Sequence, residues 1–176
     1  FLFGSFFGGE INRTVTVPTG TPIFVPIVNT EWSNPDTAAK PDFKNVPGNY
    51  TAAELANYAA SEAKAVDKIS ASIDGKAVPN MLTHRETSPI FSYTLPAKFN
   101  IDQVFFGEDI SGKVTPVAAD GFYIMLKPLS PGTHTLKYSG HIPDLSAKPP
   151  LLGEFNANVT YTINVVPKGK LNQQAP

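Results

Sequence analysis

The feature that most constrains the fold is an unbroken alternation of apolar and polar residues late in the chain. The apolar positions are Phe155, Ala157, Val159, Tyr161, Ile163 and Val165. Asparagine and threonine occupy the positions between them. Because successive side chains of a strand point to opposite faces, this pattern predicts a half-buried β-strand, the longest that we expect in the chain.

The stretch from Arg13 to Trp32 predicts two more strands joined by one turn. In the first strand, Ile11, Arg13, Val15 and Val17 share a face. Pro18-Thr19-Gly20 supplies the turn, because proline fixes φ and glycine allows the positive φ of many reversals. The second strand, 23–28, is apolar on both faces, and we expect it to be covered on both sides.

One helix is predicted over about 51–67. Thr51 and Glu54 have the spacing of a capping box, in which each side chain bonds the backbone of the other residue. An apolar stripe at helical spacing follows, formed by Leu55, Ala59, Ala63 and Val66. Its small alanines predict close packing on a sheet.

The other segments predict further short strands and loops. Asp74-Gly75 predicts a hairpin between 69–73 and 76–78. Further strands are expected at 91–95, and at 122–127 paired in a hairpin with 133–138. The segments expected to be loops are 33–49, a polar connector at 81–87, 100–115 with a short strand near 104–106, and 143–150. About eight strands and one helical insertion predict an all-β fold, an antiparallel Greek-key sandwich of Ig-like or jelly-roll-like type. We expect this single domain to span 1–167, with a polar tail at 168–176.

Composition excludes several classes of function. The net charge is −1 without a basic run, so the long-range attraction that nucleic acid or an anionic membrane requires is missing. No cysteine is present, which excludes a disulfide, a thiolate zinc site and a thiol nucleophile. The apolar start of the chain is far shorter than the roughly 20 residues of a membrane-spanning helix, so we expect no transmembrane segment.

Four polar residues fall near predicted strand faces or strand ends and form the first candidate site. Arg13 and His134 each share a face with apolar residues, while Asp74 and Asp120 lie near strand ends. Since a buried arginine requires a partner, we expect a structural network of these residues. The alternative is an enzyme whose Arg13/His134 pocket holds an anion. No Gly-x-Ser-x-Gly motif is present, and no catalytic residue is assigned.

Trp32 is the second candidate. With Glu31 and Asn29 it has the groups of a sugar-stacking platform, which would make the chain a carbohydrate-binding module with a polysaccharide partner. A tryptophan packed in the core is the favoured alternative. The spacing of His84, His134 and His141 fits no metal motif, and we predict no metal or cofactor.

The first residues of the chain are strongly apolar. Phe1, Phe3, Phe6 and Phe7 must be covered in a soluble protein. A glycine-flexed segment of this kind can pair as a strand with an open sheet edge of its own chain or of a second copy. The second arrangement predicts a homo-oligomer or a filament.

Several short motifs, each different, occur between Phe3 and about Val165. They are Gly4-Ser5-Phe6-Phe7-Gly8-Gly9, then Arg13, Val17-Pro18-Thr19-Gly20, Phe24-Val25-Pro26-Ile27-Val28-Asn29, Asp74-Gly75, the Tyr93-centred strand after Ser88-Pro89, Ala119-Asp120-Gly121-Phe122-Tyr123 and Leu129-Ser130-Pro131-Gly132-Thr133-His134. Together they resemble a family of uncharacterised secreted bacterial proteins. The resemblance implies export and a β-rich domain, and it implies no reaction. We therefore expect a secreted or cell-surface, non-enzymatic protein with a structural or adhesive role, whose partner is a second copy or a surface or matrix component.

Overall fold

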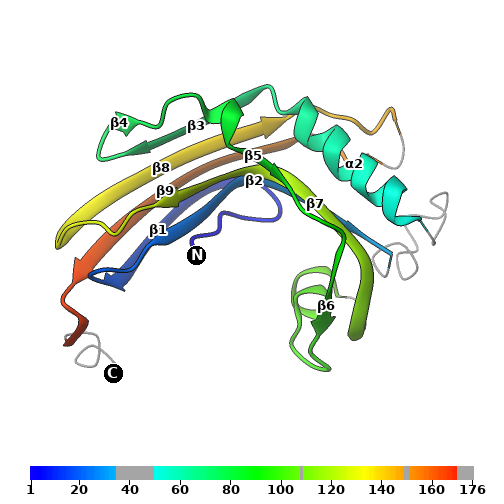
Figure 1. Cartoon of the computed structure of the whole chain (residues 1–176), viewed down its shortest axis with the longest axis horizontal. Coiled ribbons are helices and arrows are strands. Elements are labelled where there is room, and N and C mark those ends of the chain that lie inside the picture. Colours follow the sequence, from blue (N-terminus) through cyan, green and yellow to red (C-terminus); the bar gives the residue numbers. More distant parts are fainter. Residues whose placement is uncertain (35–49, 108, 149–150, 170–176) are drawn as a thin grey trace.

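The computed structural model describes residues 1–34, 50–107, 109–148 and 151–169 (Figure 1). Within these ranges the strands form two sheets. The first sheet contains, in spatial order, β1 (Gly9–Pro18), β9 (Phe155–Val166), β8 (Gly132–Ile142), β3 (Lys68–Ile73) and β4 (Lys76–Ala77). The second contains β2 (Ile23–Ser33), β7 (Gly112–Leu126) and β5 (Arg85–Thr87), and β6 (Phe91–Leu95) also pairs with β7. The helices are α2 (Ala52–Ala65), the 3-10 helix η2 (Met81–His84) and the π-helix η3 (Asp102–Phe106).

The two sheets pack face to face, which confirms the predicted all-β sandwich. The main core joins Leu136 and Val159 of the first sheet to Val25 and Phe122 of the second. Gly140 lets the layers meet closely, because a Cβ at that position would lie only 1.8 Å from Val28 Cγ2. In Figure 1 the strands curve over the start of the chain, and α2 lies at one end of the sandwich.

The helix α2 packs against β2 and β7 at that end. Its predicted capping box is present, since Glu54 N donates to Thr51 Oγ1 and Thr51 N donates to Glu54 Oε2. Leu55 and Ala59 of the predicted stripe are buried in a second core with Trp32. The helix therefore covers part of the second sheet, as its alanines predicted.

Two predictions about strand pairing were wrong. Strand β1 runs parallel to β9, so the first sheet is not purely antiparallel. Strands β7 and β8 lie in different sheets, although we expected a hairpin between 122–127 and 133–138. Strand β2 pairs with one edge of β7, and β5 and β6 pair with its other edge. Strand β8 is paired with β3 on one edge and with β9 on the other. The connection between β7 and β8 must therefore cross from one layer to the other.

Local structure also differs at three places. The predicted connector at 81–87 contains η2 and β5, and the strand expected near 104–106 is the π-helix η3. At 15 residues β7 is longer than β9 at 12, because it begins inside the segment expected to be a loop. The Asp74-Gly75 turn between β3 and β4 is confirmed. Most of the predicted loop 33–49 and of the tail 168–176 lies outside the described residues.

Candidate functional site

A groove of about 970 Å³ opens between the sheets beside the outer edge of β2. The consecutive residues 26–31 of β2 all line it, as expected where a strand presents its edge and not one face. Tyr138 and Ile142 of β8, and Ala157 and Val159 of β9, form its floor. The volume falls in the range of small-molecule and peptide sites. This groove is the candidate functional site.

Residues 1–7, which we call the leading segment, lie along one side of this groove. Leu2 N donates to Phe24 O of β2 at 3.0 Å, and the Leu2 side chain is buried in the main core. Phe3 O accepts hydrogen bonds from Tyr161 Oη at 2.7 Å and from Arg13 Nη1. The leading segment thus links the outer edge of the second sheet to the first sheet. It does so without forming the strand that we expected, since β1 begins only at Gly9.

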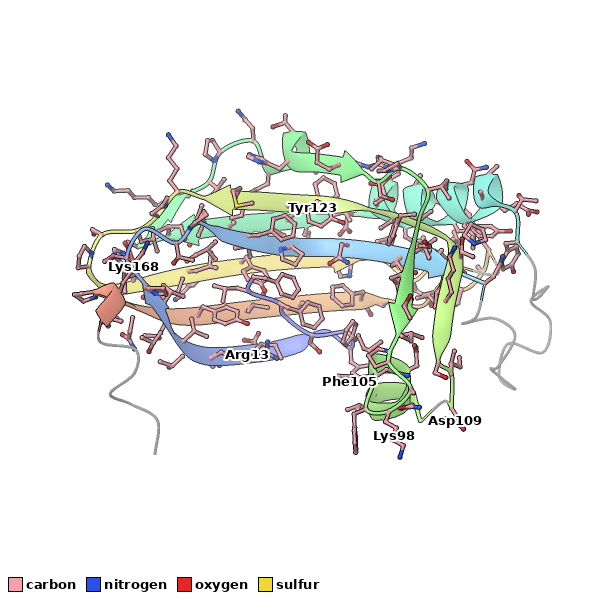
Figure 2. All side chains as sticks on the ribbon, turned by 60° about the horizontal axis from the view of Figure 1, so that its bottom comes forward. Arg13, Lys98, Phe105, Asp109, Tyr123 and Lys168 are labelled. Atoms are coloured by element: carbon pink, nitrogen blue, oxygen red, sulfur yellow. The ribbon has the colours of Figure 1, made fainter. Side chains whose placement is uncertain are left out.

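A row of aromatic rings follows the leading segment; we call it the aromatic rim. In order of contact it consists of Phe105, Phe6, Phe3, Phe1, Phe24 and Tyr123, with ring centroids 4.6 to 6.4 Å apart. Figure 2 shows Phe105 and Tyr123 far apart on the molecule. Phe1 is 78% exposed and Phe105 is 53% exposed, so much of this surface faces solvent. Sequence reasoning had not included Phe24 and Phe105, although the apolar run Val104-Phe105-Phe106 was a visible signal.

The charged side chains of the described groove lining are all acidic. Its described lining contains Glu31, Glu62, Asp102 and Asp109, and no lysine, arginine or histidine. Glu62 is buried and accepts from Trp32 Nε1 at 3.1 Å and Leu152 N at 3.2 Å. Burial raises the pKa of Glu62, although these hydrogen bonds oppose the shift. The lining therefore suits an apolar or cationic ligand.

One buried hydroxyl beside the leading segment has no hydrogen-bond partner among the described residues. This is Tyr138 Oη, and a Cβ on Gly4 would lie 3.3 Å from it. Burial also raises the pKa of Tyr138, so the phenol stays protonated. A buried polar group without a partner costs about 1–3 kcal/mol. The leading segment therefore covers this part of the groove floor without supplying a hydrogen-bond partner for Tyr138 Oη.

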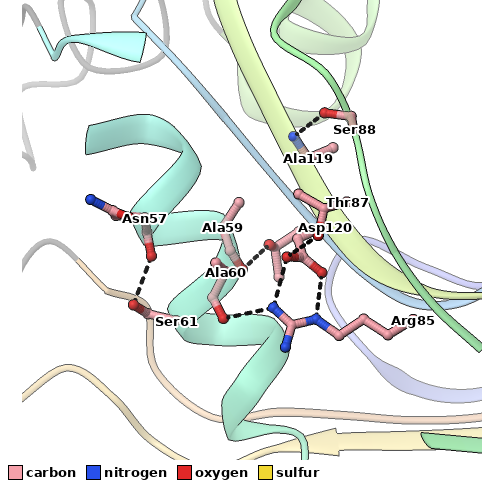
Figure 3. A network of polar contacts seen from close by, with 10 residues as sticks. Asn57, Ala59, Ala60, Ser61, Arg85, Thr87, Ser88, Ala119 and Asp120 are labelled. Carbon is pink, nitrogen blue, oxygen red and sulfur yellow. Dashed lines mark hydrogen bonds and ion pairs between the residues drawn. The ribbon is translucent and has the colours of Figure 1, made fainter. Parts of the chain in front are cut away.

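The predicted buried acid Asp120 forms an ion pair, but with an arginine that we had not singled out (Figure 3). Asp120 accepts from Arg85 Nε at 2.8 Å, Arg85 Nη2 at 2.7 Å and Thr87 Oγ1 at 2.9 Å. Arg85 Nη2 also donates to Ala60 O of α2 at 3.2 Å. The ion pair raises the pKa of Arg85. Its role is structural, since it fastens β5 and β7 to the helix.

His134 and Asp74 contact each other, but the Asp74 side chain is 45% exposed, so the pair lies at the surface and not in the buried network that we predicted. His134 Nδ1 lies 2.7 Å from Asp74 Oδ2, and this contact raises the pKa of His134 and lowers that of Asp74. A second pair of this kind, which we did not predict, joins His141 to Asp67, with Glu154 on the other ring nitrogen. Both histidines lie on β8, near its opposite ends.

The prediction that Arg13 is buried and paired with an acid was wrong. Arg13 is exposed, and it donates to Phe3 O and Tyr161 Oη but forms no ion pair within the described chain. Arg13 lies in register with Tyr161 of β9, but β1 is the edge strand of the first sheet and the Arg13 side chain is exposed. Arg13 and His134 share no contact, and neither lines the groove. The expected network is therefore divided, and the Arg13/His134 pocket is not formed.

The structure also contradicts the sugar platform built on Trp32. Trp32 is 7% exposed, packs in the second core and donates to Glu62, so its faces are unavailable for stacking. Tyr58 of α2 contacts its ring at a centroid distance of 5.2 Å. Glu31 and Asn29 are exposed and line the groove instead. The favoured alternative of a core tryptophan is confirmed.

Metal sites, membrane-spanning helices and similarity to known proteins give no further indication of function for the described chain. In the described ranges, no three His, Asp or Glu side chains cluster as metal ligands. None of the described helices has the length and apolar character that a membrane crossing requires. No family model matches the chain, and no curated protein or solved structure matches it either. The groove and the aromatic rim are therefore the features of the described chain that point to a function.

Proposed function

We propose that the protein is a non-enzymatic structural or adhesive protein that associates with further copies of itself through the aromatic rim. The single observation that carries this proposal is the exposure of the rim. A row of six aromatic rings runs beside an open groove, and Phe7 next to it is 68% exposed. Contiguous apolar surfaces of this kind mark interaction sites on soluble proteins.

The charge of the chain supports association between identical copies. A net charge of −1 gives almost no long-range repulsion between two molecules. Proteins near neutrality also associate more readily than strongly charged ones. Burial of the rim contributes about 25 cal/mol for each Å² of apolar surface removed from water. A few hundred Å² of rim surface therefore supplies several kcal/mol.

Static light scattering over a range of protein concentrations tests this proposal. We expect the mass to rise with concentration, and the double variant Phe6→Ser/Phe105→Ser to stay monomeric at concentrations where the parent associates. Leu82→Ser is the matched control, because Leu82 is 65% exposed on η2 and does not line the groove. A parent chain that is monomeric throughout, or a control that loses association equally, would contradict the proposal.

The groove supports a second candidate function, the binding of an apolar small molecule. Its volume of about 970 Å³ and its mainly apolar floor suit an acyl chain or a similar ligand. A fluorescent probe with an uncharged head group and an acyl chain should bind, and Ala157→Phe should weaken binding because Ala157 lies in the floor. Asn158→Phe is the control, because its side chain lies on the opposite face of the same strand. Equal binding by both variants would contradict this candidate.

We propose further that the protein is exported and that it binds a surface or matrix partner. Export to the cell exterior is supported by the resemblance to secreted proteins, and fractionation of the source cells would test it. A surface or matrix partner, including a polysaccharide, fits an adhesive role. The finer topology, Greek-key with Ig-like or jelly-roll-like connections, stays a prediction.

A further inference from the structure

We propose that two copies of the chain exchange their leading segments, so that residues 1–7 of one copy occupy the position beside β2 in the other. This inference rests on the proposed self-association and names the segment that carries it. The occupant of the site is thus a second copy of this chain. Three features of the leading segment support this exchange: the glycines that attach it to β1, the hydrogen bonds that hold it, and the apolar surface that it leaves in water.

The attachment has the character of a hinge. Gly8 and Gly9 join the leading segment to β1, and both have positive φ, +70° and +93°. A Cβ on Gly8 would lie 2.3 Å from Asn156 O, so only glycine fits there. Gly9 is the first residue of β1, and nothing lies within 4 Å of a Cβ on it, so this side of the backbone is open. Two consecutive residues with wide backbone freedom allow the leading segment to swing away from its own sandwich.

The contacts described for the leading segment are ones that a second copy can reproduce. Its backbone bonds to other described residues of the sandwich include Leu2 N to Phe24 O and the two hydrogen bonds accepted by Phe3 O. Leu2 is its one large side chain in the main core, while Phe1, Phe6 and Phe7 are exposed. An identical segment from a second copy makes the same contacts with Phe24, Arg13 and Tyr161. Exchange therefore loses no contact within the site.

The gain comes from the surfaces that a single copy leaves in water. When the leading segment enters a neighbour, the aromatic rims of the two copies are brought together. Phe105 of η3 contacts Phe6, and Val104 and Ile101 are near neighbours of Phe105 in the chain; all three are exposed. Packing these residues against a second copy removes apolar surface from water in addition to the exchanged contacts. Reciprocal exchange gives a closed dimer, and exchange in one direction gives a chain of copies.

Disulfide trapping tests the exchange directly, because the natural chain has no cysteine. A Cβ on Gly4 lies 3.1 Å from Val159 Cγ2, where the sulfur of a cysteine at 159 can sit, and this closeness suits a disulfide. Gly4→Cys and Val159→Cys are made as separate variants, one carrying a tag that changes its size. They are mixed at the concentration where the parent associates, oxidised, and separated on a non-reducing gel.

The expected result is a disulfide-linked heterodimer of one tagged and one untagged chain, in an amount that rises with concentration. Both positions are buried, so this bond forms only when the leading segment of one chain enters the other. Each variant oxidised alone measures the background of homodimers. The double variant Gly4→Cys/Val159→Cys shows, at high dilution, whether the bond can form within one chain.

Association without the heterodimer, in a protein whose double variant closes within one chain, would overturn the exchange and leave self-association standing. A parent that light scattering shows to be monomeric would overturn both proposals. Should the buried cysteines prevent folding, Phe1→Cys and Phe24→Cys replace them, because these rings are stacked 6.4 Å apart at the exposed rim. A short bis-maleimide, applied to the double variant Phe1→Cys/Phe24→Cys at high dilution, then ties the leading segment to its own chain. Loss of association after the linked protein is concentrated is the result expected for exchange, and unchanged association would overturn the exchange.

Discussion

Replacing Arg85 with methionine should lower the free energy of unfolding by about 3–5 kcal/mol. The Asp120 side chain is 0% exposed, and two of its three hydrogen bonds come from Arg85. Hydrogen bonds to a charged group contribute about 1.5–3 kcal/mol each, so the loss of two agrees with this range. Arg85 itself is 26% exposed, which favours the lower end, near 3 kcal/mol. Thr87 alone cannot replace the lost positive charge.

Urea unfolding followed by fluorescence measures this loss. Trp32 is the single tryptophan, and it packs on α2, whose Ala60 O also accepts from Arg85. For a urea slope of about 1–3 kcal/mol per M, a loss of 3 kcal/mol lowers the midpoint by about 1–3 M. Arg13→Met is the matched control, because Arg13 is exposed and donates only to the neutral acceptors Phe3 O and Tyr161 Oη, which leaves no buried charge when it is removed; we expect a loss of about 1 kcal/mol.

The double variant Arg85→Met/Asp120→Leu separates lost pairing from lost packing. With both charges removed, no carboxylate is stranded in the interior, and most of the stability should return. An Arg85→Met protein that unfolds at the same urea concentration as Arg13→Met would refute the assignment of a buried ion pair. A double variant less stable than Arg85→Met would show that packing, and not charge, dominates at this site.

Two further predictions concern the core and the histidine pairs. Trp32→Ala should cost about 3–5 kcal/mol in urea unfolding followed by circular dichroism, as removal of a large core aromatic does, and an unchanged midpoint would contradict its burial. Hydrogen bonds to Asp67 and Asp74 raise the pKa of His141 and His134, respectively, in the folded state. Their stabilisation is therefore complete below the unfolded pKa near 6.5 and is lost as the pH rises through the raised folded pKa. The melting temperature of the parent should therefore fall as the pH is raised through the folded pKa of the two histidines. The melting temperature of the double variant His134→Gln/His141→Gln should not show this fall.

The sequence predicted those features that depend on neighbours along the chain. Period-two alternation located β9, β3 and β6, because the side-chain direction of a strand is a local property. The capping box of α2 and the Asp74-Gly75 turn were predicted for the same reason, since each is completed within four residues. The apolar start of the chain also marked the leading segment as a surface that requires a cover.

Which side chains contact each other was decided only by the tertiary structure. Nothing local distinguishes Arg13 from Arg85 as the partner of Asp120, which lies 35 residues from Arg85 along the chain. The edge position of β1 exposes Arg13, whereas α2 encloses Asp120. Likewise, Trp32 became a core residue because Leu55 and Ala59 of the helix pack with it and Glu62 accepts its indole N–H.

The groove is likewise a product of assembly, because it lies between the edge of β2, the floor of the first sheet and the leading segment. These parts are far apart in the sequence. Alternation determines which face of a strand is apolar, but the strand's neighbours and the layer above it follow from how the whole chain closes around its core.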